Sequence, residues 1–135
     1  MTLTLEVAER ALRAGREHAT TLGVAACLVV CDAATHLKAF ARMDRAWLGA
    51  MDVALRKAKT SVLFEAETQA IWEVCRPDAQ AHGLESSNGG LITFAGGIPI
   101  RSTTGELLGA VGVSGGQVAQ DYAVAQAAVN ALDLG

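Results

Sequence analysis

A glycine-rich motif around one serine is the first feature of this chain whose residue types could do chemistry. The segment Gly112-Val113-Ser114-Gly115-Gly116 matches the G-x-S-x-G pattern, in which a strand-to-helix turn exposes a nucleophilic serine. In hydrolases with this turn the acid and the histidine follow the serine, whereas all three histidines here precede Ser114. We therefore expect Ser114 to cap a helix, with the glycines allowing close backbone approach, or the N–H groups at that helix start to bind a carboxylate or phosphate.

The three histidines are candidate ligands for a metal. His18 borders the apolar stripe of the first predicted helix, where a histidine either packs at the rim of a core or faces a groove. His82 lies in a long loop and could cover a pocket. His36 stands next to a predicted turn, so we expect it to be exposed.

Acid–base chemistry is a second possibility. Asp44, His36, His82 and Lys57 all carry groups that take up or release protons. Two such groups within hydrogen-bond reach of a substrate would suit proton transfer. The residues by themselves are consistent with an enzyme and with a binding protein.

The size, charge and hydrophobicity of the chain limit the kinds of molecule with which it can associate. The chain has 135 residues, a common size for a single domain, here 1–135. Its net charge of −3 and aromatic content of 4% offer no basic, aromatic face to nucleic acid. The longest apolar run, 24–31, is too short to cross a membrane, and we expect a cytoplasmic protein. Because 51% of the residues are hydrophobic and 19% charged, we expect a homo-oligomer that buries apolar surface between its copies.

Hydrophobic periodicity predicts the elements of the first half. Apolar residues recur every three or four positions over 5–22, which indicates an amphipathic helix with Thr4 as its cap. The continuous apolar run 24–31 indicates a central strand with two buried, reduced cysteines. Alternation over 36–43 predicts a second strand in a hairpin with it. Asp44 is expected to cap the helix that follows.

The second half adds three helices and three strands. The expected helices cover 48–62, 67–75 and 116–132, and the expected strands cover 91–94, 98–102 and 107–113. A long loop over 77–90 separates the first two of these helices from the three strands and the last helix. The order α-β-β-α-α-β-β-β-α, with hairpin-length links, implies a five-stranded antiparallel sheet with packed helices, an α+β fold.

Several short motifs resemble those of a known family. Gly96-Gly97-Ile98-Pro99-Ile100, the glycine-rich motif after it, Arg42-Met43-Asp44 and Lys57-Ala58-Lys59-Thr60 resemble the GlcG/HbpS haem-binding family. That family is related to the C-terminal domain of PduO-type cobalamin adenosyltransferases. The resemblance spans about 24–128 and implies a profilin-like arrangement of the sheet and helices. Arg45 stands in place of the family's glycine, and we expect a changed turn there because arginine does not easily take positive φ.

The resemblance implies haem as the cofactor. Since the chain lacks a C-x-x-C-H motif, the haem would be bound non-covalently, with His18 or His82 as the ligand of the haem iron. Met43 and Met51 are soft enough for the iron, but their spacing is typical of core packing. Further candidate contacts to the cofactor are Arg42, Asn88, Ser114, Gly115 and Asp121.

Two functions therefore follow from the sequence, beside a purely structural role as a subunit of a homo-oligomer. The first is binding of haem, a related tetrapyrrole or another small molecule in a groove beside the sheet or between copies of the chain. The second is an isomerase, hydratase or lyase that acts on a small organic acid in a catabolic pathway, with Asp44, His36 and Lys57 as its catalytic candidates.

Overall fold

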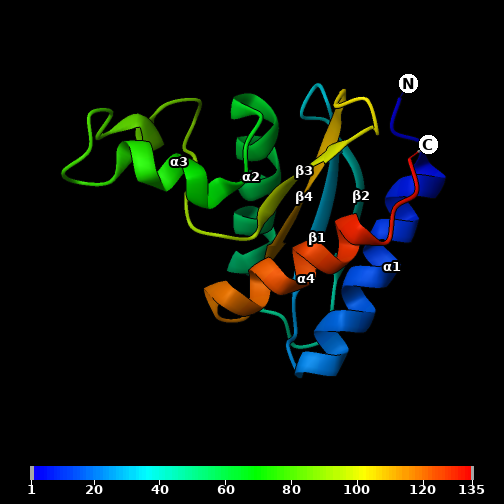
Figure 1. Cartoon of the computed structure of the whole chain (residues 1–135). Coiled ribbons are helices and arrows are strands. Elements are labelled where there is room, and N and C mark those ends of the chain that lie inside the picture. The colour runs from blue at the N-terminus through cyan, green and yellow to red at the C-terminus, as the bar shows by residue number, and fades with distance from the viewer. Residues whose placement is uncertain (1, 135) are drawn as a thin grey trace.

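The structure is a computed structural model that describes residues 2–134, and within them four α-helices pack on a four-stranded antiparallel sheet (Figure 1). The elements are α1 (Leu5–Leu22), β1 (Cys27–Asp32), β2 (Leu37–Arg42), α2 (Gly49–Phe64), α3 (Thr68–Cys75), a 3-10 turn (Leu84–Ser86), β3 (Gly97–Arg101), β4 (Leu107–Ser114) and α4 (Val118–Asn130). The expected α+β class is confirmed. Among these helices none has the length and hydropathy that a membrane span requires.

The sheet has the strand order β2-β1-β4-β3, so β1 and β4 lie in its middle. Val30 of β1 is in register with Ala39 of β2 on one side and with Val111 of β4 on the other. The two central strands are buried along nearly their whole length, which explains why β1 appears in the sequence as a continuous apolar run. The edge strand β2 is largely exposed.

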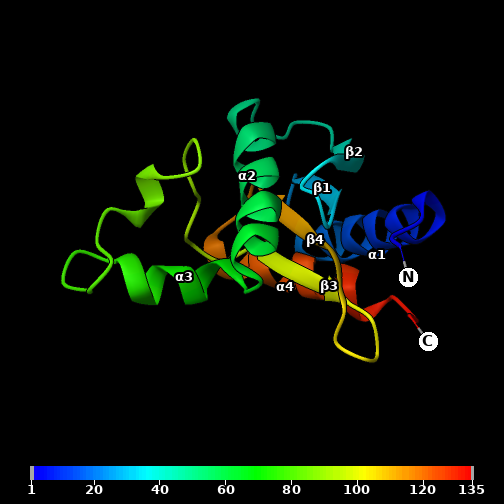
Figure 2. The ribbon, with the colours of Figure 1, turned by 90° about the horizontal axis from the view of Figure 1, so that it is seen from above.

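Helices cover both faces of the sheet (Figure 2). On one face α1 and α4 pack against each other and against Leu28 and Val111. On the other face α2 lies along β1 and β4, and Ala54 packs with Val29. Successive residues of a strand point to opposite faces, so Leu28 and Val29 enter different hydrophobic clusters. Helix α3 and the segment after it project beyond the sheet (Figure 1).

Gly112 allows α2 to lie directly on β4. A Cβ atom added at Gly112 would collide with the carbonyl oxygen of Ala54 and lie 2.7 Å from the backbone nitrogen of Ala58. Any side chain at this position would push the helix away from the strand. The close packing of the second core therefore depends on this glycine.

The strand predicted at 91–94 does not form, and the prediction of five strands is wrong. Polar side chains of the helices bind the backbone here instead of a neighbouring strand. The Ile92 N–H donates to Thr60 Oγ1 of α2 at 3.3 Å, and the Gly97 N–H donates to Thr68 Oγ1 of α3 at 3.0 Å. The apolar run is thus anchored against α2 and α3, which sequence periodicity does not reveal.

The structure corrects two predicted helix caps and confirms a third. Helix α2 begins beyond Asp44 and has no side-chain cap. Ser114 is the last residue of β4, and Gln117 occupies the N-cap position of α4. Thr4 caps α1 as expected, since its Oγ1 accepts a hydrogen bond from the Val7 N–H at 3.1 Å.

Candidate functional site

A buried ion pair lies where the glycine-rich end of β4 meets α2 and α4. The side chain of Lys57 is fully buried and that of Asp121 is 3% exposed. Lys57 Nζ donates to Asp121 Oδ2 at 3.2 Å and to the Val113 carbonyl at 2.7 Å. The ring of Phe94 lies over the same ammonium, with 4.7 Å between Nζ and the ring centroid. One pair of charges thus joins helices from opposite faces of the sheet.

Burial acts against the charge on both members of this pair. Removal from water lowers the pKa of Lys57 and raises the pKa of Asp121, while the attraction between the two groups opposes each shift. Gly96, at a φ of +129°, lies directly against the lysine ammonium, because a Cβ atom added at Gly96 would lie 2.6 Å from Lys57 Nζ. The lysine side chain is therefore enclosed within the fold and does not face a hollow.

The start of α4 is occupied by a carboxylate of the chain itself. The Gly116 N–H donates to Asp121 Oδ1 at 2.9 Å, and Gln117 heads a capping box. One of the N–H groups expected to bind a carboxylate or phosphate at this helix start thus already has an acceptor within the chain. Gly115, at a φ of +147°, permits the close backbone approach expected from the sequence, because a Cβ there would lie 2.8 Å from Ala26 Cα.

An open hollow of about 570 Å³ lies between α1 and the end of β2. It is lined by Arg13, Arg16, Glu17, Thr20, Ala41, Arg42, Met43 and Asp44. Within residues 2–134, Arg13, Arg16 and Arg42 form no ion pair. Three guanidinium groups are therefore free to bind an anionic ligand at one place.

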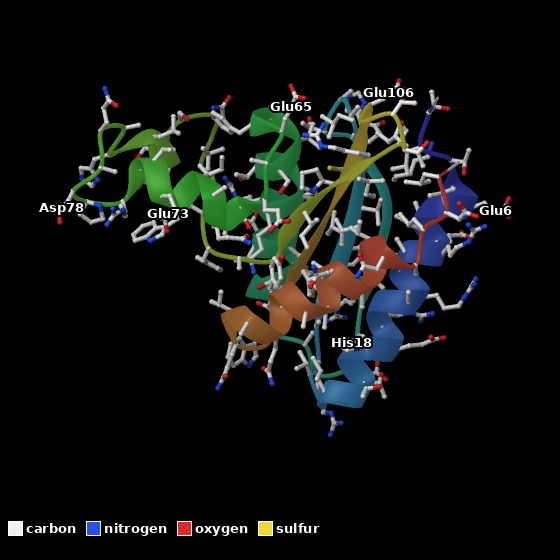
Figure 3. All side chains as sticks on the ribbon, in the orientation of Figure 1. Glu6, His18, Glu65, Glu73, Asp78 and Glu106 are labelled. Carbon is white, nitrogen blue, oxygen red and sulfur yellow. The ribbon has the colours of Figure 1, made fainter. Side chains whose placement is uncertain are left out.

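The three histidines lie in separate parts of the structure. His18 is half-buried on α1 but does not line the α1–β2 hollow (Figure 3). His36 is exposed, with Nδ1 at 3.9 Å from Asp32 Oδ2. His82 is exposed beyond α3, with Nδ1 at 3.4 Å from the Cys75 carbonyl. His18 and His82 share none of the hollows described here.

The other residues predicted from the sequence are only partly brought together. Arg42 and Asp44 line the same hollow. His36 and Asp44 flank opposite ends of β2, and Lys57 is enclosed, so these catalytic candidates do not share a site. Asn88, at a φ of +54°, lines a separate hollow of about 250 Å³ beside α2.

Sequence reasoning missed Arg13 and Arg16 as site residues. Their spacing of three residues places them on one face of a helix, and this signal is visible in the sequence. Met43 is half-buried, packs against the first core cluster and also lines the hollow. Met51 is 37% exposed, so its expected place in the core is wrong.

Known proteins resemble this chain over nearly its whole length. A profile described as haem degrading protein, HbpS-like, matches residues 3–130. The chain belongs to the HbpS-like family. An uncharacterised 15.0 kDa protein from the dhaT-dhaS intergenic region of Citrobacter freundii is 33% identical to this HbpS-like chain over 130 residues. The match covers 96% of this chain and 91% of that protein.

Two further relatives connect this HbpS-like chain with PduO. The crystal structure of a PduOC–haem complex has a TM-score of 0.94 and 34% identity, and the match covers 100% of this chain and 98% of that one. The corrinoid adenosyltransferase PduO of Salmonella typhimurium is 36% identical over 124 residues, which are 91% of this chain but 37% of PduO. The chain therefore spans little more than a third of that enzyme.

Proposed function

We propose that this HbpS-like protein binds haem non-covalently in the hollow between α1 and β2. The proposal rests on the three arginines of the hollow, Arg13, Arg16 and Arg42, which have no ion-pair partner within residues 2–134. The similarity to a haem complex supports the choice of ligand. The volume of about 570 Å³ also falls within the range of cofactor sites.

The residues of the hollow fit the chemistry of haem. Its two propionates need cations, and a guanidinium group binds a carboxylate through two parallel hydrogen bonds. Ala41 and Met43 provide apolar surface for the ring. Glu17 and Asp44 offset part of the charge, but three arginines against two carboxylates leave the lining net positive. Bound haem would supply a redox-active iron.

We propose His18 as the axial ligand, with His82 as the second histidine candidate. Of the two histidines, only His18 lies on an element that lines the hollow, because α1 supplies Arg13, Arg16, Glu17 and Thr20. A one-residue step along a helix turns a side chain by about 100°, so His18 itself points to another face of α1 than Glu17. Figure 3 shows Asp78, which lies in the same loop as His82, on the opposite side of the molecule from His18. Met43 lines the hollow directly, and its thioether belongs to the known classes of haem ligand.

The remaining predicted contacts lie outside this hollow. Ser114, Gly115 and Asp121 stand where β4 meets α4, and Asn88 stands beside α2. Their contact with a cofactor stays a prediction of the sequence and has no part in the site proposed here.

Haemin titration of the purified apoprotein tests the location of the site. We expect Arg42→Ala to weaken haemin binding at least about tenfold, because a charge-assisted contact contributes roughly 1.5–3 kcal/mol. Arg76→Ala is the matched control, since Arg76 is an exposed arginine that pairs with Glu73 outside the hollow. An unchanged affinity in Arg42→Ala, or an equal loss in Arg76→Ala, would place haem elsewhere.

The Soret band of the haem-loaded variants tests the ligand of the iron. We expect His18→Ala to shift the band and His82→Ala to leave it unchanged, because losing an axial ligand alters the coordination of the iron. Met43→Leu tests ligation by the thioether. A band that is unchanged in both histidine variants would reject the histidine assignment.

The acid–base enzyme stays a second proposal from the sequence, and its catalytic candidates lie apart within one copy of the chain. Lys57 is enclosed by Asp121, Phe94 and the backbone of β4. His36 and Asp44 lie at opposite ends of β2 and are both exposed. A substrate cannot contact these groups together in this arrangement.

We also propose that copies of the chain associate into a homo-oligomer. Trp47 is 77% exposed and Leu48 is 66% exposed, next to the start of α2, and Phe40 and Met51 are exposed as well. Large apolar side chains that gather at a surface are typical of interfaces. The GlcG type, the profilin-like arrangement, the single-domain organisation and the cytoplasmic location stay proposals from the sequence.

A further inference from the structure

Three exposed apolar side chains from separate segments converge on a third hollow. Trp72 comes from α3, Phe94 from the segment before β3, and Val118 from the first turn of α4. Each of them is between 42% and 46% exposed. Together with Gln69, Thr93 and Ala95 they line about 330 Å³.

A contact with the buried Lys57 side chain holds the ring of Phe94 in its partly exposed position. Its ring lies over the buried Lys57 ammonium, 4.7 Å from Nζ, and this attraction favours the observed ring position. The chain on either side is anchored too, because Thr93 is buried and the Val113 N–H donates to the Gly96 carbonyl at 2.9 Å. The aromatic wall is therefore formed before any ligand arrives, as in most small-molecule sites.

The lining of this hollow carries no charge. Its side chains are apolar except for Gln69 and Thr93, and Gln69 Nε2 donates to Glu67 Oε1 at 2.7 Å. An ionised ligand would lose its hydration here without gaining a counter-charge. The α1–β2 hollow, in contrast, is lined by three arginines. The charged hollow therefore suits an anionic ligand, and the uncharged one suits a neutral ligand.

We propose that this hollow is a separate ligand site that takes a small, planar, uncharged aromatic molecule. Such a molecule can stack on, or meet edge-on, the rings of Trp72 and Phe94. The volume of about 330 Å³ lies at the lower end of the range of small-molecule sites. A second copy of the chain is the alternative occupant, and the mass measurement below distinguishes it from a small ligand. The proposal goes beyond haem binding and does not depend on it.

A neutral fluorescent probe tests the proposal in the full chain. The protein has two tryptophans, so Trp47→Phe leaves Trp72 as its one tryptophan reporter. We expect 6-propionyl-2-(dimethylamino)naphthalene, which is planar and uncharged, to bind this variant saturably, with a rise in probe fluorescence and a fall in Trp72 emission through energy transfer. The absence of saturable binding overturns the proposal.

Two variants of the hollow locate the probe. Phe94→Ala removes one aromatic wall, and Val118→Asp introduces a charge at a helix start where the dipole tolerates aspartate, so α4 should still form. We expect each to weaken probe binding at least tenfold in the Trp47→Phe background. Phe40→Ala is the matched control, because Phe40 is an exposed aromatic residue on β2 that does not line the hollow. Unchanged binding in both hollow variants, or an equal loss in the control, contradicts the assignment.

Two further measurements separate this site from its alternatives. Haemin should leave the bound probe in place, and displacement of the probe by haemin would make the hollow part of the haem site. Val118→Asp should leave the mass measured by analytical ultracentrifugation unchanged. A lower mass in this variant would make the hollow an interface between copies and overturn the proposal.

Discussion

Lys57 and Asp121 lie 64 residues apart in the chain and form one buried ion pair. The sequence suggested a chemical role for both residues, but the structure shows that each is already engaged. Asp121 Oδ1 accepts from the Gly116 N–H, and Lys57 Nζ donates to the Val113 carbonyl. Breaking such a pair leaves an unpaired charge in the interior, which costs more free energy than the pair itself contributes.

Lys57→Met tests this account at the level of one residue. We expect the free energy of unfolding in urea to fall by about 3–5 kcal/mol, because Asp121 then stays buried without a counter-charge. Adding Asp121→Asn should restore part of the loss, since a neutral amide can still accept from the Gly116 N–H. Lys59→Met, on the same helix, is the control. A Lys57→Met variant that unfolds within about 1 kcal/mol of the parent would show that the pair carries little stability.

Arg45 stands where the resembling family has glycine, and it adopts a φ of +70°. The left-handed conformation is therefore kept here in spite of the side chain. We expect Arg45→Gly to raise the free energy of unfolding by about 0.5–1 kcal/mol, because only residues with a Cβ atom are strained in this region. Arg45→Ala keeps the Cβ atom and should bring no such gain. Thermal unfolding of the two variants measures the difference, and an equal gain in both would assign it to the arginine side chain.

Among the elements, α2 and β4 make the most extensive contact, and Gly112 allows the helix to approach the strand closely. Helix α2 also carries Lys57 to the end of β4, so the register of the helix on the strand positions the ion pair. A helix displaced at Gly112 would move Lys57 as well. Packing and electrostatics are thus coupled through one element.

Gly112→Ala tests the packing of α2 on β4. We expect a loss of about 3 kcal/mol in the free energy of unfolding, because the added methyl group meets backbone atoms of Ala54 and Ala58, which cannot rotate away. Gly49→Ala is the matched control, since nothing lies within 4 Å of its added Cβ atom. It should be neutral or slightly stabilising. Equal stability of the two variants in urea would refute the proposed contact.

For the whole molecule, the exposed apolar residues at the start of α2 support the proposed association. We expect sedimentation equilibrium at micromolar concentration to return a mass above the 14.0 kDa of one chain. Replacing Trp47 and Leu48 by serine should lower that mass, because these are the two most exposed large apolar side chains on residues 2–134. The control is Leu5→Ser, an exposed leucine on α1. A parent protein that sediments as a single chain would contradict the proposal.

The sequence by itself determined the class of the fold and most of its elements. The continuous apolar run in β1 indicates burial on both faces of the sheet, and the apolar periodicity of α1 indicates one buried stripe. Both patterns can be recognised in the sequence because each arises within a single element. The motifs around Arg42, Lys57 and Ser114 were sufficient to recognise the family, since they are short and local. Haem binding was also inferred at this stage, through that resemblance.

Only the tertiary structure decided what these residues do. The sequence shows Ser114 before a helix, but strand pairing extends β4 to include it and leaves the cap to Gln117. The sequence presents Asp121 as a candidate contact to a cofactor. In the structure its carboxylate accepts a hydrogen bond from Lys57, whose position depends on the packing of α2. Strand pairing and contacts between distant segments are properties of the folded chain, and local sequence patterns do not encode them.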